Sequence, residues 1–219
     1  MLNKIKPFQV KLLTVALAVF GGLLFIAPTT QMQEQTMKNN MKMSADEAMA
    51  GWTGKPRETA MKMIQKYGQP NEVTMSMLVW NNNGAWKRTI VYRDEIPHSF
   101  PMAHTDFLEQ FIDYRVPLKS YSALAEYDGS VIVERTKGEM SARCDMEEMN
   151  LLALNLANDI ATGKRSVKAA RKFYAETAMA FKKGQMSPYV QTLQFQVQKG
   201  GTADPDQPAM MNKDMKMMK

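Results

Sequence analysis

The sequence predicts an α+β fold, in which a small antiparallel sheet of three or four strands packs with several helices and is flanked by disordered tails. Three observations predict it. Apolar residues recur at helical spacing in long stretches near both ends of the central region. Two strand-like runs surround Asn81-Asn82-Asn83-Gly84. Later in the chain, Leu193, Phe195 and Val197 alternate with glutamines, which is the period of a half-exposed strand.

The first predicted elements are a helix and a hairpin. Pro56 suits a first helical turn, apolar residues then recur every three or four positions up to residue 67, and Gly68 can end the helix. Residues 75–80 and 85–93 are rich in strand formers. The asparagines and the glycine between these two runs accept the positive φ angles that a hairpin turn requires.

The middle of the chain predicts two short helices and a strand. Thr105 can cap a helix over residues 107–112, because Phe107, Leu108, Phe111 and Ile112 fit one helical face. A second helix is expected over residues 120–127. Asp128-Gly129 then turns the chain into a strand over residues 130–135.

Two long helices and a last strand complete the predicted domain. Apolar residues from Met146 to Ile160 form one stripe that ends before Gly163. Ser166 can cap the next helix, which runs through Lys183 and stops at Gly184. The alternating residues 193–197 follow as the final strand.

The N-terminus carries an export signal. Residues 12–27 are uniformly apolar and follow Lys4, Lys6 and Lys11, which is the arrangement of a secretory signal or a membrane anchor. The run spans about 24 Å as a helix, which is shorter than the roughly 30 Å bilayer core and favours a transient signal. No clean cleavage site follows it, so an uncleaved anchor remains an alternative. Both readings place the body in the periplasm or on the outer face of the cytoplasmic membrane.

The chain divides into four predicted parts. Residues 1–29 are the signal peptide or signal anchor, and residues 30–50 are a flexible linker rich in Met, Gln and Lys. Residues 51–198 form a single α+β domain, and residues 199–219 are a disordered tail rich in Met and Lys. The one cysteine of the chain, Cys144, excludes an intramolecular disulfide, so the domain must be stabilised by its apolar core.

The charge of the chain argues against a nucleic-acid partner. The net charge is +6, but the three lysines before the apolar run supply half of it. The other basic residues are interspersed with acidic ones, as in Glu134-Arg135, and form no dense stripe. We expect a mildly basic surface, with membrane contact only through the N-terminal segment if that segment is not cleaved.

Part of the chain resembles known exported proteins. The segments W-N-N-N-G-A-W-K-R-T, H-S-F-P and S-A-R-C-D, within residues 51–174, resemble a family of uncharacterised exported bacterial proteins. The first helix, its ending Y-G-Q-P and the hairpin are similar to the start of BamE-type envelope proteins. Those proteins carry a lipidated cysteine, whereas no cysteine follows the apolar run here, so the likeness implies no lipid anchor. Neither resemblance implies catalytic residues.

One loop and the single cysteine are the candidates for metal binding or catalysis. His98 and His104 are the only histidines, and Met102 lies between them in a proline-punctuated loop. Imidazole with thioether suits a borderline or soft metal such as copper. Cys144, near the start of the long helix, is either a small buried residue or, with the two histidines, the centre of an enzyme. The enzyme hypothesis requires these three side chains to converge in one cleft.

Methionine is unusually frequent, with 21 residues in 219. Thioethers in flexible tails select Cu(I), so the tails predict copper binding or buffering; the alternative is that Met and Lys are simply tolerated there. The first group is Met32, Met37, Met41, Met43 and Met49, and the last is Met210, Met211, Met215, Met217 and Met218.

Trp80 and Trp86 flank the predicted turn and are either core residues or an exposed partner-binding pair. Taken together, the sequence favours an exported, non-catalytic binding or interaction domain whose partner is an envelope protein or a small ligand. Copper binding and an enzyme centred on His98, His104 and Cys144 are the two alternatives.

Overall fold

The described part of the chain is one antiparallel sheet with helices packed against it. The computed structural model describes residues 43–209. Within them six strands have the order β1-β2-β3-β4-β6-β5, and every neighbouring pair is antiparallel. The strands are β1 (Glu72–Val73), β2 (Met77–Asn83), β3 (Trp86–His98), β4 (His104–Asp113), β5 (Val131–Glu134) and β6 (Glu139–Cys144). The α+β class is confirmed, and the sheet is larger than the three or four strands predicted.

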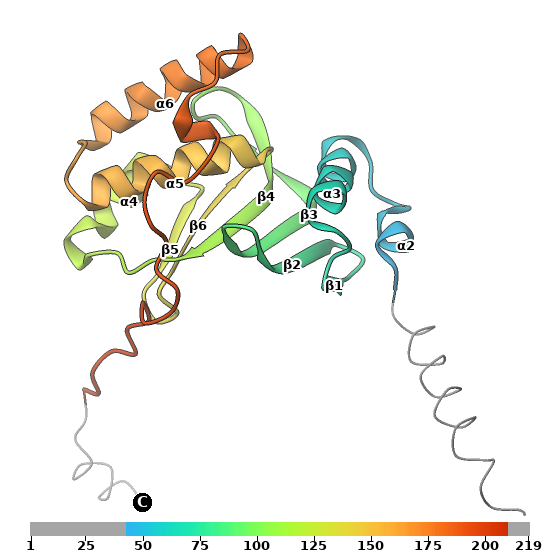
Figure 1. The fold of residues 1–219 in the computed structure, drawn as a ribbon, viewed down its shortest axis with the longest axis horizontal. Coiled ribbons are helices and arrows are strands. Elements are labelled where there is room, and N and C mark those ends of the chain that lie inside the picture. Colours follow the sequence, from blue (N-terminus) through green and yellow to red (C-terminus); the bar gives the residue numbers. More distant parts are fainter. Residues whose placement is uncertain (1–42, 210–219) are drawn as a thin grey trace, which may run out of the picture. The chain divides into compact units, whose positions relative to one another are not determined.

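The helices form two groups along the sheet (Figure 1). One group is α2 (Ala45–Met49) and α3 (Gly54–Tyr67), whose buried residues share a core with β2, β3 and β4. The other is α4 (Tyr121–Tyr127), α5 (Glu147–Ala161) and α6 (Val167–Lys182), which share a core with β4, β5 and β6. No helix among residues 43–209 has the length and apolarity needed to cross a membrane.

The first helix, the hairpin and the long helices lie where the sequence predicts them. Gly68 ends α3 with φ 80°, and the turn between β2 and β3 uses positive φ at Asn82 and Gly84. Ser166 caps α6 by accepting from the Ala169 amide. These elements carry local start or stop residues as well as a repeating apolar pattern, so two independent local features agree at each.

The sequence misassigned three stretches of the chain that involve strands. Residues 107–112, predicted as a helix, belong to β4, and β6 was not predicted at all. Residues 193–197, predicted as a strand, form none. Asn155 of α5 instead holds this stretch, because its amide donates to the carbonyls of Tyr189 and Thr192 and its oxygen accepts from the Gln194 amide.

Folded residues lie beyond both predicted boundaries of the domain. Residues 45–49, inside the predicted linker, form α2, and Met49 is buried in the core. Beyond residue 199, Thr202 is 2% exposed and the Asp204 amide donates to the Arg135 carbonyl. A Cβ on Gly138 would lie 2.2 Å from the Thr202 carbonyl carbon, so the returning chain needs glycine there. The predicted signal segment over residues 1–29 lies outside the described residues.

Candidate functional site

The hairpin of β3 and β4 brings the two histidines together. His98 is the last residue of β3, His104 is the first of β4, and the strand register places them directly opposite each other. Their ring centroids lie 4.8 Å apart. The proline-punctuated segment predicted from the sequence is thus the tip of a hairpin, and it places both imidazoles on one side of the sheet.

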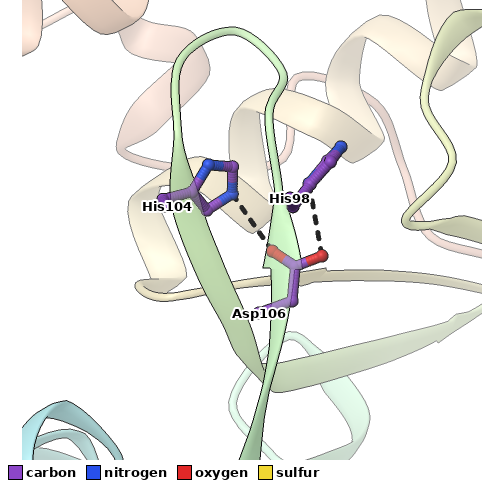
Figure 2. Close-up of side chains that lie close together, drawn as sticks. All are labelled: His98, His104 and Asp106. Atoms are coloured by element: carbon purple, nitrogen blue, oxygen red, sulfur yellow. Dashed lines mark ion pairs between the residues drawn. The ribbon is translucent and has the colours of Figure 1, made fainter.

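Asp106 completes a three-residue cluster. It lies two positions after His104 on β4, so both side chains project from the same face of the strand. Its Oδ1 is 3.1 Å from His104 Nε2 and its Oδ2 is 3.2 Å from His98 Nδ1 (Figure 2). Asp106 is only 3% exposed, and one donor atom from each of the three residues lies within 4.8 Å of the others.

The second ring nitrogen of each histidine faces a different acceptor. His104 Nδ1 donates to the Met102 carbonyl at 2.8 Å, because a carbonyl oxygen can only accept. His98 Nε2 faces Asp128 Oδ1 at 3.6 Å. Asp128 follows α4, and its Oδ1 accepts from the amide and hydroxyl of Ser130 at 2.9 and 2.8 Å. Each imidazole therefore turns one nitrogen outward to an acceptor and the other inward to Asp106.

This orientation concentrates electron pairs at the centre of the cluster. When each neutral ring carries its proton on the outer nitrogen, the inner nitrogens present lone pairs to a carboxylate. Within residues 43–209, His98 Nδ1 and Asp106 Oδ1 are buried without a hydrogen-bond partner. A positive charge is needed between these atoms, and either a proton or a metal ion can supply it. The Asp106 carboxylate, followed by the Cys144 thiol, accordingly raises the pKa of His104 to about 11.

Cys144 lies beside this cluster. It is the last residue of β6, is 5% exposed, and places its Sγ 3.4 Å from His104 Nε2. It is not one of the three residues whose donor atoms all lie within 4.8 Å of one another. Burial raises the pKa of the Cys144 thiol, with His104 acting in the opposite direction. The side chain is therefore a buried thiol next to a three-donor site.

The convergence of His98, His104 and Cys144 does not produce the orientation of a nucleophilic triad. In such triads the carboxylate holds the ring nitrogen opposite the one that faces the nucleophile. Here Asp106 and Cys144 both approach His104 Nε2, while Nδ1 is engaged by a backbone carbonyl. A protonated, buried thiol is also a poor nucleophile. The geometry favours binding over covalent chemistry.

A cavity of about 380 Å³ opens beside the cluster. His104 and Cys144 form part of its wall, and most of the rest is apolar. The other residues that line it are Lys55, Pro101, Met102, Ala103, Asp145, Met146, Met149, Tyr174, Ala178, Phe181 and Lys182.

The other residues singled out in the sequence are not brought to this site. Trp80 and Trp86 are 1% and 3% exposed, so the hypothesis of an exposed partner-binding pair was wrong. Their indole nitrogens donate to the Gly68 carbonyl and to Glu147, which fixes both rings in the core. The methionines at positions 210, 211, 215, 217 and 218 lie outside the described residues.

Sequence reasoning missed Asp106 and Asp128. Asp106 was hidden because residues 107–112 were predicted as a helix, where an acidic residue in the first turn is ordinary. Read as a strand, His104-Thr105-Asp106 has the two-residue spacing that places ligands on one face. Asp128 was interpreted as a turn residue, and no local pattern connects it to a histidine 30 positions earlier.

Comparisons with known proteins do not identify the function. No protein-family model matches the chain, and no curated protein and no solved structure is significantly similar to it. The function must therefore be argued from the chemistry of the site itself.

Proposed function

We propose that this protein is an exported metal-binding protein that holds one divalent transition-metal ion, Zn²⁺ in first place. The ligands are His98 Nδ1, His104 Nε2 and the Asp106 carboxylate, and Cys144 stands beside them on the side of the cavity. The apolar run over residues 12–27 supports export, and the protein would act in the periplasm or at the outer face of the cytoplasmic membrane.

One observation carries this proposal. Both histidines have their outer nitrogen directed at an acceptor and their inner nitrogen directed at the same buried carboxylate. Metal-binding histidines characteristically have an acceptor on the far nitrogen, which fixes the ring and makes the ligating nitrogen more basic. Two rings prepared in this way around one carboxylate are expected of a metal site.

The distances also suit a small transition metal. Ligand atoms about 2.1 Å from a tetrahedral ion lie about 3.4 Å from one another. The two nitrogen–oxygen separations of 3.1 and 3.2 Å, one to each oxygen of the Asp106 carboxylate, are close to this value, and one donor atom from each of the three residues lies within 4.8 Å of the others. Imidazole ligands favour Zn²⁺, Cu²⁺, Ni²⁺ or Fe²⁺ over Mg²⁺ and Ca²⁺, which prefer oxygen. Three protein ligands with a further position open are typical of exchangeable or catalytic zinc.

The direct test is a zinc titration of the metal-free protein against a chromophoric chelator. We expect one Zn²⁺ per chain, and Asp106→Asn should weaken binding at least 100-fold because it removes the only carboxylate of the cluster. Asp94→Asn is the matched control: Asp94 also lies in this hairpin, on β3, but its side chain is exposed and pairs with Arg93. Equal zinc affinities for wild type and Asp106→Asn would overturn the proposal.

A melting curve separates site binding from loose surface binding. A ligand present at 100 times its Kd stabilises the folded state by about 2.7 kcal/mol. Zinc should therefore raise the Tm of the wild type and of Asp94→Asn, and leave that of Asp106→Asn unchanged. A rise of equal size in all three proteins would show that zinc binds elsewhere.

Copper is a second candidate, favoured by one further observation. Met102, Met146 and Met149 line the cavity next to Cys144 and His104, so thioether, thiol and imidazole groups share one space. These are the donor types that select Cu(I). A Cu(I) titration under reducing conditions tests this candidate. Binding that survives Cys144→Ala and His104→Ala would show that Cu(I) binds outside the cavity.

A further inference from the structure

The cavity beside the metal site is itself suited to a small molecule. Its volume of about 380 Å³ lies at the lower end of the range of roughly 300–1,000 Å³ typical of ligand sites. Apolar groups from three elements surround it: Met102 from the hairpin tip, Met149 from α5, and Ala178 and Phe181 from α6. An apolar wall with a few polar groups is the usual character of such a site.

The two lysines that line the cavity differ in their partners. Lys55 Nζ lies 3.6 Å from Asp145 Oδ2, so its charge is balanced within the protein. Lys182, the last residue of α6, has its Nζ 2.7 Å from Met102 Sδ. A thioether is a weak acceptor and carries no charge. Among residues 43–209, Lys182 has no carboxylate within ion-pair distance.

We propose that this cavity binds a small aliphatic monocarboxylate. The carboxylate pairs with Lys182, and the hydrocarbon chain lies against Met149, Ala178 and Phe181. A charge-assisted hydrogen bond to an ammonium that lacks a carboxylate partner supplies the selectivity for an anion, and burial of the chain supplies most of the affinity. This site goes beyond the metal centre, since none of these four residues belongs to the three-ligand cluster.

The test uses octanoate with two comparison ligands. Isothermal titration of the metal-free protein should detect octanoate, should give roughly tenfold weaker binding for the uncharged octanamide, and should detect no acetate, which lacks the chain. Lys182→Gln should abolish the preference for octanoate over octanamide. The matched control is Lys172→Gln, because Lys172 lies on the same helix but does not line the cavity and has its Nζ 3.8 Å from Glu176 Oε1.

A second measurement locates the ligand without any variant. In the wild type, octanoate should shift the methyl NMR signals of Met102 and Met149 and leave that of the exposed Met61 unchanged. Equal affinity for octanoate and octanamide, no binding of either, or shifts confined to other methionines would each overturn the proposal. Asp106→Asn should bind octanoate normally, so failure of the zinc proposal and failure of this one can be distinguished.

Discussion

At the scale of single residues, Asp106 and Asp128 have different tasks in the proposed metal site. Asp106 meets the inner nitrogens of both histidines, whereas Asp128 faces only the outer nitrogen of His98. Burial raises the pKa of Asp128, and hydrogen bonds from Ser130 act in the opposite direction. Asp128 is thus held in place by the turn after α4 and can orient the His98 ring without touching the ion.

We expect Asp128→Asn to weaken zinc binding by roughly 10–100-fold, the usual effect of removing an acceptor behind a metal-binding histidine. The amide oxygen can still accept from Ser130, so the turn should survive and the stoichiometry should remain one. Chelator competition measures the affinity, and urea unfolding of the metal-free variant checks the fold. An affinity equal to that of the wild type would show that Asp128 has only a structural role.

Glu147 is the centre of a second buried polar group. From the first turn of α5 it accepts from Lys66 and Tyr67 of α3, Trp86 of β3 and Gln110 of β4. Burial alone would raise the pKa of Glu147, but the hydrogen bonds from Lys66, Tyr67 and Trp86 outweigh it and lower the pKa below its ordinary value. This carboxylate connects the helices and strands of both core clusters.

The lowered pKa of Glu147 makes the stability of the folded protein depend on pH. Because the folded state holds Glu147 at a lowered pKa, the unfolded chain binds the proton more readily, and the stabilisation is complete above about pH 4.5. It is lost as the pH falls through the folded pKa. We predict that Glu147→Gln lowers the free energy of unfolding by about 2 kcal/mol at pH 7. The difference from wild type should shrink below pH 4.

Urea unfolding at pH 7 and pH 3.5 measures both quantities. Glu126→Gln is the control, since Glu126 is exposed on α4 and away from this group. A constant difference between wild type and Glu147→Gln at the two pH values would contradict the role assigned to the ionised carboxylate.

At the scale of elements, the sequence correctly predicts the helices whose ends and apolar faces are marked by nearby residues. The helices α5 and α6 combine a long apolar stripe with Gly163 and with the Ser166 cap, and both are confirmed.

β4 is buried at five consecutive positions, from Asp106 to Gln110, so it lacks the alternation of a half-exposed strand. Its spacing of apolar residues then imitates a helix. Strand β6, Glu-Met-Ser-Ala-Arg-Cys, is buried through pairing with β4, which no local pattern reveals.

The last predicted strand, over residues 193–197, does not form because it has no partner strand. Residues 193–197 have the correct alternation, but a strand needs a partner, and the three hydrogen bonds of Asn155 hold this stretch on α5 instead. Tertiary contacts override local propensity here. In the candidate site, His98, His104 and Cys144 could be identified from residue type alone. The two aspartates could not, because their place in the site depends on strand register and on a turn far away in the sequence.

Asn155→Ala should release the stretch that follows η2 (Pro188–Val190). Loss of the Asn155 amide leaves the Tyr189 carbonyl and the Gln194 backbone amide without a partner and takes from the Thr192 carbonyl one of its two donors, at a cost of about 1–3 kcal/mol. Hydrogen exchange should accelerate at Gln194 and its neighbours, while the amides of β4 and β6 keep their protection. In the control Thr162→Ala, the lost hydroxyl bonds only carbonyls of α5, so exchange near Gln194 should not change.

At the scale of the whole molecule, the folded part extends to both sides of the predicted domain. Met49 and Thr202 lie outside the predicted boundaries of 51–198 and are both buried. Asp204 adds ion-pair contacts with Arg115 and Arg135. A truncation that removes the predicted tail from residue 199 would therefore also remove part of the fold, and any loss of metal binding in it could not be assigned to the methionines.

Truncation after Ala209 avoids this difficulty. It removes the five methionines from Met210 to Met218 but leaves the contacts of Thr202 and Asp204, so its Tm should match that of the intact chain. If the tail binds Cu(I), the truncated protein should bind fewer Cu(I) ions while its Zn²⁺ stoichiometry stays at one. Truncation after Gln198 should instead lower the Tm by several degrees. If truncation after Ala209 leaves the Cu(I) stoichiometry unchanged, the tail does not bind copper. The zinc proposal would not be affected, because the ligands of the two sites lie in separate parts of the chain.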